Sequence, residues 1–154
     1  MVGAGDINGD GSADVVIQNA SGRSLYTSTS GGQQFPGDVS GWINIANVPG
    51  WQVRGVADFN ADGFADVLIQ QASGTNQVVF ADMHNGMNNG FTAATTGLPA
   101  DYRVVGVGDV NNDGYTDVIV QQQSTGITSY AAQGPAGFDH WGNVANVGTH
   151  WHAM

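Results

Sequence analysis

Short apolar runs bounded by turn-forming residues dominate the hydrophobic pattern of this chain. The run ADVVIQ (13–18) recurs as ADVLIQ (65–70) and as TDVIVQ (116–121), and turn-forming residues flank each copy. Such β-branched runs are typical of β-strands, and QVVFADM (77–83), which follows ASGTN (72–76), continues as a hairpin partner. Because no stretch of about ten residues keeps the helical apolar period of about 3.6, the pattern predicts strands and no helix.

The chain is built from an internal repeat. The acidic stretch DINGDGSAD, which begins at Asp6, returns as DFNADGFAD from Asp58 and as DVNNDGYTD from Asp109, so the period is about 51 residues. The similarity extends beyond this stretch, because WQVRGVAD from Trp51 and YRVVGVGD from Tyr102 precede it and related Gln-rich and Ser-rich segments follow it. Agreement in several places along three copies indicates a true repeat.

Each repeat is expected to hold four strands. These are the segment before the acidic stretch, the segment after it, a third after an SG turn, and a fourth near Trp42, Phe91 or Trp141. Four strands in about 50 residues predict one blade of a β-propeller. The sequence therefore predicts a single all-β repeat domain with three four-stranded blades. We assign the blades to about residues 2–50, 51–101 and 102–154.

The two ends of the chain match two halves of one strand. Trp151, in the closing HWHAM, falls where Trp51 and Tyr102 begin the strand that leads into an acidic stretch. The opening VGAGD matches the second half of that same strand. One blade's first strand is therefore expected to be split between the termini.

Three blades alone leave apolar faces uncovered. A blade hides these faces only against neighbouring blades, and propellers have about 4 to 8 blades. We therefore expect a homo-oligomer in which chains associate head to tail, most simply two chains in a six-bladed ring, whereas association that does not close gives a fibre. The alternative is that the chain is part of a longer propeller protein.

Composition narrows the setting of the protein. All 13 acidic residues are Asp, and three Arg with no Lys leave a net charge of −10, which argues against nucleic acid or an anionic membrane surface as partner. Only 10% of the residues are charged, so neutral polar groups cover most of the surface, which favours an extracellular or cell-surface location. No apolar run approaches the roughly 18 residues of a membrane span, and the first residues lack the pattern of a signal peptide.

Nine of the 13 carboxylates lie in the three acidic stretches, hereafter the acidic loops. In D-x-N-x-D-G-x-x-D, positions 1, 3, 5 and 9 supply side-chain oxygens and position 7 a backbone carbonyl, while Gly at position 6 permits the sharp turn. This all-oxygen set with three carboxylates favours Ca²⁺ over Mg²⁺ or Zn²⁺ and predicts three Ca²⁺ per chain. The alternative is turn chemistry alone, since Asn, Asp and Gly populate any tight hairpin. The candidate ligands are Asp6, Asn8, Asp10, Ser12 and Asp14; Asp58, Asn60, Asp62, Phe64 and Asp66; and Asp109, Asn111, Asp113, Tyr115 and Asp117.

The acidic loops resemble an EF-hand up to position 9 and then depart from it. An EF-hand needs an acidic group at position 12 and a following helix, whereas position 12 here is Ile17, Ile69 or Val120 within a β-branched run. The loop therefore joins two strands, and the chain resembles the FG-GAP or VCBS type of repeat found in integrin α-subunits and many secreted bacterial proteins. The resemblance implies a calcium-binding propeller, in a family that ranges from adhesins to lectins and enzyme accessory domains. Ala61 departs from the Gly that the family pattern most often has.

Two sets of aromatic residues recur in phase with the repeat. They are Trp42, Phe91 and Trp141, and Trp51, Tyr102 and Trp151. Recurrence in phase is what packing between blades requires, so we expect these side chains in the core. The alternative is that some of them line sugar-binding clefts between blades, where aromatic faces and neutral amides suit a carbohydrate.

The sequence offers little for catalysis. It contains no Lys, no G-x-S-x-G and no Ser, His and Asp constellation that breaks the repeat, so no enzymatic activity is expected. The first hypothesis is a calcium-binding, self-associating scaffold outside the cell, with a structural, adhesive or binding role toward a glycan or an extracellular protein. The second is a lectin with sites between blades, and the third is an accessory piece of a polysaccharide-acting enzyme.

Overall fold

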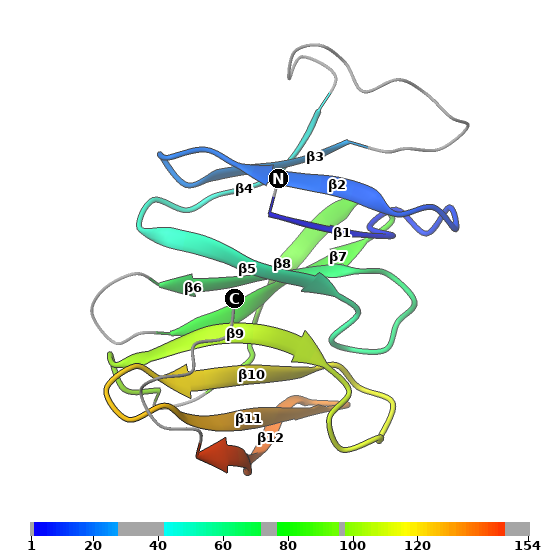
Figure 1. The fold of residues 1–154 in the computed structure, drawn as a ribbon. Coiled ribbons are helices and arrows are strands. Elements are labelled where there is room, and N and C mark those ends of the chain that lie inside the picture. Colours follow the sequence, from blue (N-terminus) through cyan, green and yellow to red (C-terminus); the bar gives the residue numbers. More distant parts are fainter. Residues whose placement is uncertain (1, 28–41, 72–76, 96–97, 147–154) are drawn as a thin grey trace.

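The fold is all-β, as the sequence predicts. The computed structural model describes residues 2–27, 42–71, 77–95 and 98–146, which form twelve strands in three sheets (Figure 1). The first sheet contains β1 (Gly3–Gly5), β2 (Asp14–Gln18), β3 (Arg23–Thr27) and β4 (Ile43–Asn47). The second contains β5 (Trp51–Ala57), β6 (Asp66–Gln71), β7 (Val78–His84) and β8 (Met87–Ala93). The third contains β9 (Tyr102–Gly108), β10 (Asp117–Gln122), β11 (Ile127–Gly134) and β12 (Gly137–Asn146).

Each sheet is a four-stranded antiparallel meander whose strands pair in sequence order. Figure 1 shows the three meanders stacked one above another, with β5 between β1 and β9. This confirms four strands per repeat, and a stack of such meanders is the arrangement of propeller blades. The segment 151–154, expected to contain half of a split strand, lies outside the described residues.

Glycine lets the first strands of neighbouring sheets approach closely. A Cβ atom at Gly3 would lie 2.5 Å from Cγ2 of Val56 on β5, and one at Gly55 would lie 2.9 Å from Cγ1 of Val107 on β9. Gly3 and Gly55 occupy the same position of the repeat. The repeat therefore keeps glycine where the next sheet places a valine.

Two apolar layers fill the spaces between the sheets. Because side chains alternate along a strand, Val67 and Ile69 of β6 pack toward the first sheet while Leu68 packs toward the third. The first layer also holds Val16 and Tyr26, and at most 2% of any of these five side chains is exposed. The short apolar runs of the sequence thus serve two cores at once.

Glutamine side chains bridge the sheets at the ends of these strands. Gln18 donates from Nε2 to the Trp51 carbonyl at 3.1 Å, and its Oε1 accepts the Val53 N–H at 3.0 Å. Equivalent bonds of 3.0 and 3.2 Å join Gln70 to the Tyr102 carbonyl and the Val104 N–H. Each amide satisfies two backbone groups of the next sheet and fixes its register.

The recurrent aromatic residues do not all belong to the core. Phe91 on β8 is 50% exposed and Trp141 on β12 is 40% exposed, so the expectation of core packing is wrong for both. Both lie on the fourth strand of a meander, which has no further strand beside it in its sheet. Trp51 and Tyr102 are half-buried against the apolar layers, and Trp151 lies outside the described residues. The largest fully buried aromatic side chains of the described part are instead Tyr26, Phe59 and Phe80.

No helix in the described ranges has the length and apolar character needed to cross a membrane.

Candidate metal centre

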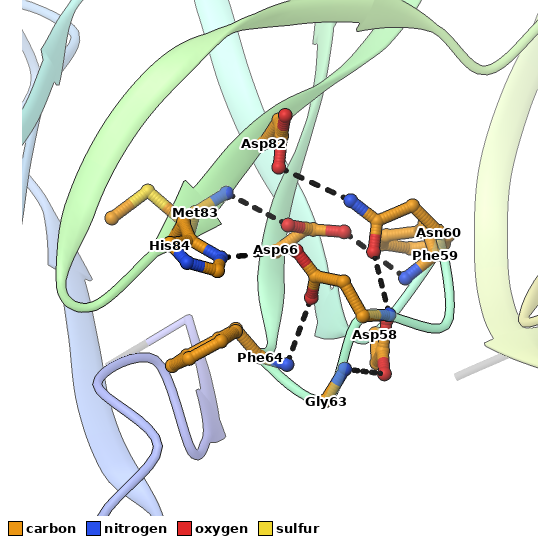
Figure 2. A network of polar contacts seen from close by, with 10 residues as sticks. Asp58, Phe59, Asn60, Gly63, Phe64, Asp66, Asp82, Met83 and His84 are labelled. Atoms are coloured by element: carbon orange, nitrogen blue, oxygen red, sulfur yellow. Dashed lines mark hydrogen bonds and ion pairs between the residues drawn. The ribbon is translucent and has the colours of Figure 1, made fainter.

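The second acidic loop joins β5 to β6 and folds back on itself through its own side chains (Figure 2). Asp58 accepts the Gly63 N–H at 2.9 Å through Oδ2. The Asp62 N–H donates to Oδ1 of Asp58 at 3.2 Å and to Oδ1 of Asn60 at 3.0 Å. Two side-chain oxygens therefore converge on one backbone N–H. Gly63 has φ of +91°, a left-handed conformation that glycine adopts without steric cost.

The other two acidic loops repeat this hydrogen-bond pattern. The position 5 N–H of each donates to the position 1 Asp at 3.1 Å, and to the position 3 Asn at 2.9 Å in the first loop and 3.0 Å in the third. In all three loops the position 7 N–H, from Ser12, Phe64 or Tyr115, donates to the position 5 Asp at 2.9 Å. The same hydrogen bonds between positions 1, 3, 5 and 7 therefore fold all three loops.

The Asp at position 9 is fully buried and ties the loop to the rest of its sheet. Asp66 accepts the Phe59 N–H at 3.1 Å and the N–H of Met83, on β7, at 2.8 Å. Asp117 makes the equivalent bonds to Val110 at 2.9 Å and Gln133 at 3.0 Å, and Asp14 accepts the Ile7 N–H at 3.0 Å. A carboxylate oxygen has more than one lone pair, so these bonds leave acceptor capacity for a cation.

The second loop crowds negative charge. Burial, assisted by the nearby carboxylates Asp62 and Asp82, raises the pKa of Asp66 to about 7, against the opposing hydrogen bonds from Met83 and Phe59. Within the described ranges, no Arg forms an ion pair with an Asp of the second or third loop. The ion-pair partner found for these two loops in the described part is His84, which lies near Asp62 and is charged only when protonated.

Two residues beside the second loop were not identified from the sequence. They are Asp82, whose Oδ1 accepts a hydrogen bond from Asn60 Nδ2 at 3.1 Å (Figure 2), and His84, whose Nδ1 lies 3.5 Å from Asp62 Oδ2. The His84 ring also packs on Phe64, with ring centroids 4.4 Å apart. The sequence does mark Asp82 and His84 as departures from the repeat, because the equivalent positions of the third repeat are Ala132 and Gly134.

The donor set fits a hard divalent cation. Each loop presents carboxylate and amide oxygens and no nitrogen or sulfur ligand, which is the chemistry that calcium prefers. Across the described ranges, no three Asp or His side chains are arranged as a group that could hold a metal ion. Side chains hydrogen-bonded to their own turns are also what turn chemistry alone predicts. A turn, however, does not require the buried carboxylate at position 9, so this residue favours the metal interpretation.

Ala61 gives a test of the loop conformation. Position 4 is left-handed in all three loops, with φ of +77° at Gly9, +59° at Ala61 and +61° at Asn112. A left-handed L-residue costs about 1 kcal/mol or more, and less for Asn. We expect Ala61→Gly to raise the free energy of unfolding by about 0.5 to 1 kcal/mol, measured by urea denaturation, and the control Asn112→Gly to change it less. A loss of stability in Ala61→Gly would contradict this conformation.

Stacked four-stranded meanders with an acidic loop between the first two strands define a class of propeller-type repeat proteins. The sequence pattern of the FG-GAP-like repeat matches residues 6–69 and 58–120, and the chain belongs to this family. The family is typically associated with β-propellers and with calcium binding. Neither curated proteins nor solved structures gave a match to the chain.

Proposed function

We propose that the protein is a non-enzymatic, calcium-binding propeller module that serves as a structural or adhesive scaffold outside the cell. The observation that carries this proposal is the threefold repetition of one loop conformation, each copy with a fully buried Asp at position 9. Nine carboxylates held in this way repel one another unless a cation joins them. A bound Ca²⁺ in each loop offsets two of the three carboxylate charges and links the loop to the following strand.

The residues that hold the ion are the side chains at positions 1, 3, 5 and 9 and the carbonyl at position 7 of each loop. Position 12, the bidentate Glu of an EF-hand, is an aliphatic residue here, which lowers the expected affinity. Sites of about 10⁻⁵ to 10⁻³ M suit the calcium concentrations that extracellular modules meet. This match supports an extracellular or cell-surface location.

Calcium stoichiometry tests the proposal directly. Isothermal titration calorimetry is expected to give about three Ca²⁺ per chain, one for each loop. Asp113→Ala removes a position 5 ligand of the third loop and is expected to lower the stoichiometry by about one. Asp101→Ala is the matched control, because Asp101 precedes β9, at the end of that strand away from the third loop, and its carboxylate accepts a hydrogen bond from Ser124. A stoichiometry unaffected by Asp113→Ala contradicts the assignment of this loop.

A cleft on the third sheet, bordered by the segment that precedes β9, supports a second candidate function, binding of a carbohydrate. It has a volume of about 220 Å³ and is lined by Leu98, Pro99, Tyr102, Ser129 and Trp141. It offers the exposed indole of Trp141 beside the Ser129 hydroxyl, a combination of apolar ring and polar group that suits a sugar.

The cleft arises from departures from the repeat. Val79, which packs on the apolar layer between the first two sheets, stands in the second sheet where the third has Ser129. Phe91 likewise stands at the position of Trp141. The smaller hydroxyl side chain and the larger ring give this site a shape that its counterpart lacks.

A glycan array followed by titration with the best-bound sugar tests the cleft. We expect Trp141→Ala to weaken binding at least about tenfold, because stacking on an aromatic ring is lost. Phe91→Ala is the control, since it truncates the equivalent exposed ring outside the cleft. If no sugar binds, or if both variants weaken binding equally, this candidate function is wrong.

A further inference from the structure

Each sheet presents an aliphatic and an aromatic side chain to the sheet that follows it. In the first sheet these are Val16 and Tyr26, which pair across β2 and β3, and in the second they are Leu68 and Phe80, which pair across β6 and β7. Val16 and Leu68 are 0% exposed, and Tyr26 and Phe80 are 2% exposed. Burial is nearly complete because the next sheet covers both pairs.

The third sheet carries the same pair without the same burial. Ile119 and Tyr130 pair across β10 and β11 at the equivalent position of the repeat, and both are only half-buried. Gln121 follows in the place that Gln18 and Gln70 hold in their sheets, so the residue type that bridges sheets is also present. Because Gln121 is 4% exposed and donates to Thr128 Oγ1 at 3.3 Å, the surface left uncovered is that of Ile119 and Tyr130, and we call it the trailing face.

The third sheet also has the glycine that the other two sheets place against the next sheet. Gly106 is the equivalent of Gly3 and Gly55, which make room for Val56 and Val107 of the next sheet. Among the described residues, the atom nearest to a Cβ built at Gly106 is Cδ1 of Ile119, in the same sheet, at 3.6 Å. Gly106 therefore leaves beside the third sheet the same space that the next sheet fills at Gly3 and Gly55.

The opposite face of the stack shows the complementary pattern. Val67 and Ile69, which face the preceding sheet, are 0% and 2% exposed, and Val118 and Val120 are both fully buried. The equivalent residues of the first sheet are Val15 and Ile17, and both are half-buried. We call the surface formed by Val15 and Ile17 the leading face.

We propose that the trailing face of one chain binds the leading face of a second copy of the same chain, head to tail. Both interfaces within the chain join a trailing-type surface to a leading-type surface, so the contact between copies continues an interface already present twice. Val15 and Ile17 of the second copy then cover Ile119 and Tyr130. In a dimer both contacts form and the six sheets close into a ring. The inference rests on the proposed scaffold function and names its partner.

Complementation between two variants tests this proposal. Ile119→Asp places a charge on the trailing face and Val15→Asp places one on the leading face. In saturating calcium, native mass spectrometry of the unmodified protein is expected to show twice the 15.9 kDa chain. Each variant alone is expected to be a monomer, whereas an equimolar mixture forms a 1:1 heterodimer through the one intact pair of faces. Met87→Asp is the matched control, because Met87 is 66% exposed on the middle sheet, and this variant stays dimeric.

Cross-linking provides a measurement that does not depend on a buried charge. The chain contains no cysteine, so Ile119→Cys and Val15→Cys each introduce a single thiol. On oxidation, the mixture is expected to give a heterodimer joined by a disulfide, in preference to homodimers of either variant.

The outcomes separate this inference from the proposed function. A monomer that binds about three Ca²⁺ overturns the docking proposal and leaves the calcium function intact. A dimer that binds no calcium contradicts the calcium function and leaves the docking proposal intact. Dimerisation of Ile119→Asp alone, or preferential cross-linking of like variants, shows contact between like faces and overturns the head-to-tail arrangement.

Discussion

Removal of calcium with EDTA is expected to lower the Tm of this protein by about 15 to 30 °C. A ligand at about 100 times its Kd stabilises the folded state by about 2.7 kcal/mol, so three equivalent sites contribute about 8 kcal/mol. For a domain of this size about 1 kcal/mol shifts Tm by about 2 to 4 °C. The stabilisation is large because each ion relieves repulsion among three carboxylates and links the acidic loop to a buried Asp.

Differential scanning calorimetry in about 10 mM CaCl₂ and in EDTA measures this effect, for sites with Kd near 10⁻⁴ M. Magnesium is the control ion, and it is expected to restore less of the Tm because its smaller shell demands a more regular octahedral geometry. Asp113→Ala is expected to lose about one third of the calcium effect and Asp101→Ala none of it. An unchanged melting curve in EDTA contradicts the calcium hypothesis.

In EDTA, stability is expected to fall as the pH rises from about 4 to about 7. Burial and nearby charges raise the pKa of Asp66 to about 7, whereas an unfolded Asp titrates near 3.9. Between these values the folded protein binds one proton more than the unfolded chain. The free energy of unfolding therefore decreases by about 1.4 kcal/mol per pH unit, for a loss of at most about 4 kcal/mol. This contribution is complete below about pH 4 and is lost above about pH 7.

Urea denaturation at several pH values in EDTA measures this slope. Asp66→Asn is expected to be less stable than the unmodified protein at acidic pH. Asp66 accepts hydrogen bonds from two backbone N–H groups, and the NH₂ group of Asn would face one of them and lose that bond. The stability of this variant should vary less with pH over the same range, since the titrating group is gone. A stability that rises with pH in EDTA contradicts the raised pKa of Asp66.

Calcium is expected to reverse the sign of this dependence. Calcium binds the ionised carboxylates, so proton release accompanies binding and calcium stabilises the protein more at high pH. The same denaturation series repeated in CaCl₂ therefore shows whether calcium and protons compete for the carboxylates of this loop.

The candidate site could be recognised from sequence because its parts are contiguous. Asp58, Asn60 and Asp62 lie within one loop, and their hydrogen bonds join residues at most five positions apart. The bond from Met83 to Asp66 spans 17 residues and depends on the pairing of β6 with β7. The approach of His84 to Asp62 depends on the same pairing, so local pattern had no means to reveal it.

The aromatic residues show why recurrence is a poor guide to burial. Phe91 and Trp141 recur in phase, yet they are exposed because they lie on the outermost strand of their meanders. Phe59 of the second acidic loop and Phe80 of β7 are fully buried, with ring centroids 5.4 Å apart, because both pack in the apolar layer against the third sheet. Recurrence identifies equivalent positions, and the number of neighbouring strands sets how much of each is covered.

Alternating apolar residues, turn residues and the spacing of the acidic loops were sufficient to predict strands, repeat and candidate ligands, since these depend on short-range geometry. Alternation also divides β10 into two faces, but it does not tell which face a neighbouring sheet covers. The stacking of the sheets buries Val118 fully and leaves Ile119 half-exposed, although the two side chains are adjacent in sequence. Burial depends on the surface brought against a side chain from elsewhere in the fold, and only the assembled stack contains that information.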